Sequence, residues 1–464
     1  MLFSSMFFLF LFLPVVCAVY FLVPKRLKND VLLAASFVFY AWGEPHYVFI
    51  MILSVFINYA GALLIEKTNF KKLFLILTVV LNLAFLGYFK YFNFLIENLN
   101  LLLHRDVVDP LRIIMPIGIS FYTFQAMSYV VDVYRKTVPA QKNIYDLALY
   151  IMLFPQLVAG PIVKYHDIAA QINDREENID KVYRGILRFI GGLAKKVMIA
   201  NTLGAVADEI FASDLQYISA PLAWIGAAAY MFQIYFDFSG YSDMAIGLCL
   251  VFGFKIPENF NYPYISKSIT EFWRRWHISL STWFKQYLYI PLGGSRVSKA
   301  RTAVNLMIVF LVTGFWHGAS WNFILWGLWH GCFVVIEKLS GLNTEKPGIL
   351  RNILLRGYAL LVVVIGWVMF RADTLPAAAE YLKKMFGLIP DKYAALDLVY
   401  YVDGQELLAF AFAVLLSTPA ARHFFDVSGK YRSAAVQIIM LALFLISSAM
   451  IAAGTYNPFI YFRF

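Results

Sequence analysis

A single histidine, His317, lies deep inside an apolar stretch and has the chemistry of a general base. It follows Trp316 and lies between Gly314 and Gly318, within the apolar residues 304–339. An ionisable side chain at such a position is costly to desolvate and is a functional candidate by default. The pKa of an imidazole suits a general base, and flanking glycines allow backbone or substrate to approach closely. The alternative is a packing histidine that hydrogen-bonds a neighbouring carbonyl in a GxxxG contact.

A second histidine, His277, lies in a segment rich in tryptophan and basic residues. Apolar residues recur there at intervals of three and four, which predicts one amphipathic helix in the membrane interface. The residues of its apolar face are Trp273, Trp276, Leu280, Trp283 and Tyr287. Off that face, Arg274, Arg275 and Lys285 either follow the positive-inside rule or form a basic lip that attracts an anionic, phosphate-bearing thioester donor. Glu271 stands four residues before Arg275, where the two can pair.

Other polar residues interrupt apolar sequence with weaker functional signals. Asp237 and Asp243 are carboxylates of a kind that, within a membrane, pairs with a cation or faces a cavity. Trp316 and Asn322 belong to the same block as the first histidine and are assigned to a polar lining or a structural role. His330 follows in a second GxxxG pattern without metal-ligand spacing, so a packing role is favoured. The sequence predicts no metal site.

Composition places these residues in a membrane protein. The chain has 464 residues, of which 61% are hydrophobic and 15% are charged, against roughly 25% charged in a soluble domain. This excludes a soluble globule and a disordered chain. A disulfide scaffold is excluded by the scattered positions of the three cysteines. The net charge of +10 lies largely in short loops, which indicates positive-inside topology and contact with anionic lipid rather than nucleic acid.

The apolar pattern predicts an all-α, polytopic bundle of about eleven spans at ~20 residues each, with re-entrant or interfacial helices. Residues 2–23 form an uncleaved helix followed by basic residues, which places the N-terminus outside the cytoplasm. We expect a broken element at residues 144–163, a tilted or interfacial helix at 185–203, and two helices or a broken one at 221–254, interrupted at 237–240. Residues 1–464 are expected to be one integral-membrane domain, without a soluble domain.

Seven sequence blocks resemble the membrane-bound O-acyltransferase (MBOAT) family, and in particular its bacterial branch for acetylation of alginate and other exopolysaccharides. The resemblance covers essentially the whole chain. The blocks are MPIGISFYTFQ (115–125), FPQLVAGP (154–161), YFDFSGYSD (235–243), FWRRWHISLS (272–281), YIPLGG (289–294), GFWHG (314–318) and NPFIYFRF (457–464).

The resemblance implies a helical bundle that encloses a tunnel across the membrane. The active-site histidine of the family matches His317, and its second motif histidine matches His277. The implied donor is acetyl-CoA or an acyl-carrier thioester, used as substrate, with no cofactor bound. The implied acceptor is an extracytoplasmic polysaccharide, reached through a separate SGNH-type acyltransferase partner at the bacterial inner membrane. Two rival classes stay open, a secondary transporter or flippase and a non-catalytic scaffold of a secretion complex.

Overall fold

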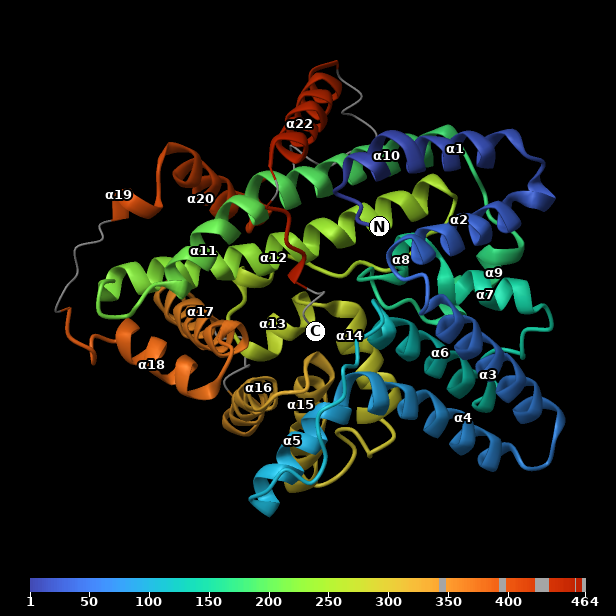
Figure 1. Cartoon of the computed structure of the whole chain (residues 1–464), viewed down its shortest axis with the longest axis horizontal. Coiled ribbons are helices and arrows are strands. Elements are labelled where there is room, and N and C mark those ends of the chain that lie inside the picture. Colours follow the sequence, from blue (N-terminus) through green and yellow to red (C-terminus); the bar gives the residue numbers. More distant parts are fainter. Residues whose placement is uncertain (342–347, 392–397, 422–433, 455, 461–464) are drawn as a thin grey trace. The chain divides into compact units, whose positions relative to one another are not determined.

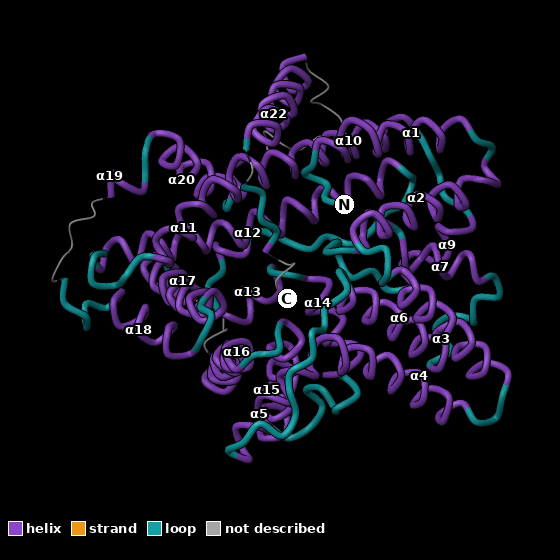
Figure 2. Tube along the Cα trace, viewed as in Figure 1, coloured by secondary structure: helices purple, strands orange, loops and turns teal. Residues whose placement is uncertain are grey.

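The computed structural model describes residues 1–341, 348–391, 398–421, 434–454 and 456–460. Within these ranges the regular elements are all helices and no strand occurs (Figure 2), so the predicted all-α class is confirmed. A helix satisfies its own backbone hydrogen bonds, which suits it to lipid. The chain divides into two compact units, Met1–Phe189 with Ser242–Pro257 and Ile190–Tyr241 with Glu258–Phe464. The expectation of a single integral-membrane domain stays a prediction.

The helices are labelled in Figure 1. The first unit contains α1 (Leu13–Leu22), α2 (Lys28–Gly43), α3 (Val48–Lys67), α4 (Lys71–Leu86), α5 (Phe92–Leu103), α6 (Ile119–Tyr134), α7 (Ile144–Met152), α8 (Phe154–Leu157) and α9 (Tyr165–Asn173). The second contains α11 (Thr202–Ala212), α13 (Ile269–Arg275), α14 (Ile278–Phe284), α15 (Lys299–His317), α16 (Trp321–Ser340), α17 (Ile349–Arg371), α18 (Leu375–Met385), α19 (Leu398–Tyr401), α20 (Gly404–Leu416) and α22 (Ala434–Ala453). Two helices, α10 (Ile179–Ala194) and α12 (Ala220–Val251), contribute residues to both units.

Seven helical segments among the described residues are long and apolar enough to cross a bilayer, and Phe8–Leu22 and Gly404–Leu416 are shorter apolar helices. This agrees with the predicted polytopic bundle. The expected number of about eleven counted every apolar stretch as a span. Some of those stretches form short helices instead, because the chain turns at Leu153 between α7 and α8. The broken element expected at residues 144–163 is therefore confirmed.

The predicted interruption at residues 237–240 is wrong, because α12 is continuous for 32 residues. Gly240 lies within the helix and serves a close approach. A Cβ at this position would lie 2.7 Å from the carbonyl oxygen of Gly192, too near for any real side chain. The polar residues that suggested a break are buried on the helix instead. Asp237, for example, is 1% exposed and lies within the helix rather than in a loop.

The helix expected at residues 185–203 belongs to a longer helical segment, Ile179–Ala212. Of the residues in the most apolar part of this segment, 67% are buried within the protein. The segment is long and apolar enough to cross a bilayer, and whether it is tilted or interfacial stays a prediction. A π-helical turn at Lys195–Asn201 joins α10 to α11 without ending the helix. It brings Lys196 into the interior, where the side chain is 4% exposed. The buried cation needs an anionic partner, which is described with the site below.

Glycines position the end of α15, where His317 lies. A Cβ at Gly314 would lie 2.3 Å from the carbonyl oxygen of Phe323, and a Cβ at Gly327 would lie 2.3 Å from the carbonyl oxygen of Phe310. The small residues therefore let α15 and α16 pack backbone against backbone, and Figure 1 shows these two helices beside each other. This close crossing, joined by the short turn 318–320, holds His317 at a defined position on the helix pair.

Candidate active site

The segment that carries His277 is two short helices, so the predicted single amphipathic helix is wrong. The first helix, α13, ends at Arg275, and His277 takes the left-handed conformation (φ 43°, ψ 55°) before α14 begins. This conformation is unfavourable for a residue with a side chain. A residue distant in sequence stabilises it, because the Asn259 carbonyl accepts from Ile278 N–H (2.9 Å) and the Asn259 amide oxygen accepts from Ser279 N–H (3.3 Å).

The same break buries the aromatic face. Trp273, Trp276 and Trp283 are 7%, 1% and 8% exposed, so they lie in the interior of the second unit rather than in a membrane interface. Their period of three and four reflects burial within a helical core, which gives the same pattern as an interfacial helix.

The hydrogen bonds of His277 define its tautomer. The side chain is fully buried, and its Nδ1 lies 3.1 Å from Asn259 Oδ1. That Asn259 atom also accepts the backbone N–H of Ser279, which identifies it as the amide oxygen and requires His277 Nδ1 to be the donor. Burial lowers the pKa of His277 to about 3, because desolvation disfavours the charged form. At neutral pH the ring is therefore uncharged and carries its lone pair on Nε2.

A buried glutamate, Glu337, positions α13 from the distant helix α16. One carboxylate oxygen accepts from Ile269 N–H (2.5 Å), and the other accepts from Thr270 N–H (2.8 Å) and Thr270 Oγ1 (2.6 Å). Tyr358 donates a further hydrogen bond to the first oxygen (3.2 Å). A carboxylate at a helix N-terminus satisfies free N–H groups and complements the helix dipole. Sequence reasoning missed Glu337, although an acidic residue near the end of an apolar run is a signal for such a role.

His317 is the last residue of α15 and is 2% exposed. Its ring is surrounded by aromatic rings, with centroid distances of 4.9 Å to Trp316, 5.0 Å to Trp326 and 5.4 Å to Phe370. The following Gly318 leaves no space for a side chain, because a Cβ would lie 2.1 Å from the ring of Phe323. The surroundings of this histidine are thus aromatic and closely packed.

The structure brings the two predicted histidines to one place. The ring of Trp316 lies 4.9 Å from that of His317 and 6.2 Å from that of His277. Phe238 of α12 packs edge-on against His277, at 4.7 Å. Trp316, which the sequence assigned to a polar lining or a structural role, is therefore a ring that contacts both imidazoles. Both imidazoles are buried in the second unit, where weak solvation strengthens electrostatic interactions.

The remaining polar candidates are partnered within the fold. Asn322 donates to the carbonyl oxygen of Ala372 (2.5 Å), which ties the start of α16 to the end of α17. Asp243 pairs with Arg188 at 2.9 Å in the first unit. In the second unit, Asp237 forms an ion pair with Lys196 (2.7 Å) and accepts a hydrogen bond from the backbone N–H of Ile460 (2.8 Å). The two aspartates thus pair with cations, the first of the two alternatives that the sequence left open.

The C-terminal segment is held by the same buried ion pair. Lys196 also donates to the carbonyl oxygen of Pro458 and to Asn201 Oδ1 (2.7 Å). Phe459 packs its ring at 4.8 Å from that of Tyr241. Sequence reasoning did not find Lys196 as the partner, because its distance from Asp237 along the chain conceals their contact. Residues 461–464 of the last sequence block lie outside the described residues.

The three basic side chains predicted to bind a donor differ in whether they already have partners within the protein. Arg275 is committed to Glu271 (2.9 Å), as its spacing predicts, and to the carbonyl oxygen of Asn261 (3.0 Å). Arg274 and Lys285 are exposed, and in the described part of the chain neither has a side-chain partner. Their charges are available to a ligand, and that of Arg275 is partly neutralised.

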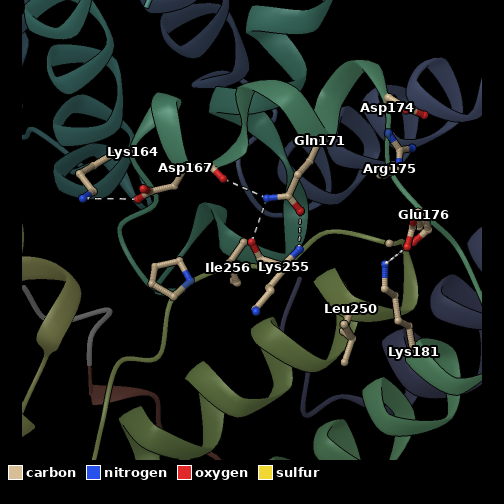
Figure 3. Close-up of a pocket in the computed structure, with 12 residues that line it drawn as sticks. Lys164, Asp167, Gln171, Asp174, Arg175, Glu176, Lys181, Leu250, Lys255 and Ile256 are labelled. Carbon is tan, nitrogen blue, oxygen red and sulfur yellow. Dashed lines mark hydrogen bonds and ion pairs between the residues drawn. The ribbon is translucent and has the colours of Figure 1, made fainter. Parts of the chain in front are cut away.

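A cavity of about 640 Å³ lies within the first unit and is lined by none of the predicted site residues. Figure 3 shows its lining, in which the Gln171 amide bonds both backbone groups of Lys255, accepting from the N–H (2.7 Å) and donating to the carbonyl (3.1 Å). Lys164 pairs with Asp167 at 3.5 Å, also visible in Figure 3. The tunnel that the family resemblance implies stays a prediction.

Groups of three or more His, Cys, Asp or Glu side chains that could hold a metal ion do not occur among the described residues.

Comparison with known proteins identifies the family of the chain. Residues 134–371, which include both histidines, match the family model described as MBOAT, membrane-bound O-acyltransferase family. The chain is 41% identical to a probable alginate O-acetylase, AlgI, of Pseudomonas putida, over the full length of both proteins. It is 39% identical to a peptidoglycan O-acetyltransferase of Helicobacter pylori, over 84% of this chain and 80% of that protein. A teichoic acid D-alanyltransferase of Bacillus subtilis is 32% identical over 49% of this chain and 61% of its own. On these matches and its apolar helices, the chain belongs to the membrane-bound O-acyltransferase family and is a multi-pass membrane acyltransferase.

Proposed function

We propose that the chain takes an acetyl group from a cytoplasmic thioester donor and passes it across the inner membrane for O-acetylation of an extracytoplasmic polysaccharide. The observation that carries this proposal is that His277 and His317, both buried, are in ring contact with the same residue, Trp316. The relatives support the acceptor class, since those named above are an alginate O-acetylase and a peptidoglycan O-acetyltransferase. Alginate, peptidoglycan or a similar polymer is the proposed acceptor.

In the proposed mechanism His317 is the general base. Its imidazole removes the proton of an acceptor hydroxyl as the hydroxyl oxygen attacks the thioester carbonyl. When the carbon–sulfur bond breaks, the protonated imidazole returns that proton to the leaving thiolate. Such proton transfer contributes typically ~10²–10⁴ in rate. His277 is held with its Nδ1–H on Asn259, so its Nε2 lone pair can accept a hydrogen bond from the acceptor hydroxyl and orient it.

The donor is proposed to be acetyl-CoA or an acyl-carrier thioester, with its phosphates bound by Arg274, Lys285 and, more weakly, Arg275. Replacing Arg274 and Lys285 together by alanine is expected to raise the KM for the donor roughly tenfold, since two exposed charge-assisted contacts are lost. The kcat is expected to change little, because neither residue contacts the histidines among the described contacts. Steady-state kinetics at two salt concentrations measures this, and the wild-type KM should rise with salt. An unchanged donor KM in the variant contradicts the assignment.

The proposed partner is a separate SGNH-type acyltransferase on the extracytoplasmic side, which completes transfer to the polysaccharide. The proposed orientation places the N-terminus outside the cytoplasm, because Lys25, Arg26 and Lys28 follow the first apolar helix. A cysteine added ahead of Met1, or introduced at the exposed Lys72, in a variant that lacks the three native cysteines tests the orientation, since only the extracytoplasmic position reacts with an impermeant maleimide in intact cells.

Labelled acetyl-CoA separates the enzyme from its two rival classes. Purified protein in nanodiscs is expected to release free CoA in the presence of an acceptor, and the label is expected to move to the acceptor. A transporter or a scaffold releases no thiol. Absence of release both with acetyl-CoA and with an acetylated carrier, with and without the partner, contradicts the proposed function.

A further inference from the structure

A third histidine, His330, lies in the aromatic cluster of the site and has no role in the proposed mechanism. It is fully buried on α16. Its ring centroid lies 5.2 Å from that of Trp326, 5.3 Å from that of Trp273 and 6.2 Å from that of Phe272. Trp326 also contacts the ring of His317, at 5.0 Å. His330 therefore packs against Trp273, which belongs to the same sequence block as His277, and against Trp326, which also contacts His317.

The polar atoms of this third histidine are unusual for a packing residue. Among the described residues neither ring nitrogen of His330 has a hydrogen-bond partner, and the indole Nε1 of Trp326 has none either. A buried polar group left unsatisfied costs about 1–3 kcal/mol, and a phenylalanine would fill a similar volume without that cost. A packing role alone therefore does not explain a histidine at this position.

Both unsatisfied groups face the same point on α17. A Cβ on Gly366 would lie 2.8 Å from His330 Nε2 and 3.5 Å from Trp326 Nε1. The glycine thus leaves room for a hydrogen-bond acceptor, the neutral imidazole, and a donor, the indole N–H, to lie close together. The two groups are chemically complementary, so a hydrogen bond between them, direct or through one water, would satisfy both.

We propose that His330 is a positioning residue that orients the Trp326 indole through its N–H and thereby holds His317 in its reactive position. This inference rests on the proposed function, because it assumes that His317 is the catalytic base. The ring of Trp326 contacts both imidazoles, so a rotation of this ring moves the surface on which His317 packs. A misplacement of a reacting group by about 1 Å can cost 10²-fold in rate.

Replacing His330 by phenylalanine tests the proposal, because it keeps the aromatic volume and removes the acceptor. The variant is expected to stay close to the wild type in thermal stability, because the aromatic volume is kept and the loss of the acceptor for Trp326 Nε1 is offset by removal of the buried, unpartnered His330 Nδ1. Its kcat is expected to fall roughly 10- to 100-fold, while the KM for the donor stays within about twofold. His330→Gln, which restores an acceptor, is expected to recover part of the kcat. A packing residue shows no such separation of stability from kcat, and a wild-type kcat in His330→Phe overturns the proposal.

Trp326→Phe tests the route. It removes the indole N–H, and the double variant His330→Phe/Trp326→Phe is expected to be no slower than the slower single variant. Multiplicative losses overturn the proposal, because they show that His330 does not act through Trp326. Trp329→Phe is the matched control on the same helix, since it removes an indole hydrogen bond to the Val362 carbonyl (3.0 Å) and should leave kcat unchanged. His317→Ala separates the two proposals, because activity in that variant defeats the proposed base, whatever His330 does.

Discussion

Replacing His317 by alanine is expected to abolish acyl transfer while the protein still inserts and folds. The loss in rate should reach at least the ~10²–10⁴-fold that general-base assistance contributes. The other imidazole in ring contact with Trp316, that of His277, is held by Asn259 and does not replace His317. Release of free thiol from labelled acetyl-CoA in a single turnover measures the chemical step. The donor KM, or donor binding to the inactive protein, is expected to stay near the wild-type value.

Two controls make this result specific. His317→Gln retains much of the side-chain volume among Trp326 and Phe370, so its inactivity cannot be attributed to an empty space in the core. His46→Ala removes an exposed histidine and should leave the rate unchanged. If His317→Ala retains near-normal polymer acetylation, the imidazole is a packing residue and the proposed mechanism fails.

The identity of the reactive block was predictable because the exceptions to the apolar pattern are few. His317 stands out as an ionisable residue between glycines, and those glycines proved to set the crossing of α15 and α16. The apolar pattern does not reveal the change in chain direction at His277, between α13 and α14. The chain is helical on both sides of His277, as the period predicts, yet His277 itself takes a left-handed backbone conformation that separates α13 from α14. The cause is Asn259, whose hydrogen bonds to the chain after His277 are contacts that local periodicity does not reveal.

The error in α12 has a related physical origin. A cluster of aspartate, serine and glycine within apolar sequence suggests a loop, since isolated carboxylates are costly in lipid. The cost disappears when a cation on another helix neutralises the carboxylate, and Lys196 does so for Asp237. The helix can then continue through Gly240, where the glycine serves a helix contact. The sequence contained both charges, but their pairing depends on which helices adjoin in the fold.

This buried ion pair gives the second large expected effect. Replacing Lys196 by methionine should destabilise the protein by about 3–5 kcal/mol, because it leaves the Asp237 charge buried without a partner. Asp237→Leu should be similarly damaging, since it strands the lysine and also removes the acceptor of the Ile460 N–H. The double variant Lys196→Met/Asp237→Leu should be more stable than the sum of the two losses predicts, because it contains no isolated charge. Thermal unfolding in detergent, followed for each variant at one pH and one salt concentration, gives the differences.

The chain offers a matched control for the effect of burial. Lys383 and Glu380 form an ion pair with the same 2.7 Å separation, but their side chains are 52% and 50% exposed, against 4% and 2% for Lys196 and Asp237. An exposed pair contributes about 0–1 kcal/mol, so Lys383→Met should leave stability nearly unchanged. Equal effects of Lys196→Met and Lys383→Met would show that the buried pair is solvated in the membrane protein, and that the interior around Asp237 is wet rather than dry. A large loss of stability confined to Lys196→Met instead identifies this pair as the attachment of the C-terminal segment to α12. The same helix carries Phe238, the residue next to Asp237, whose ring packs against His277.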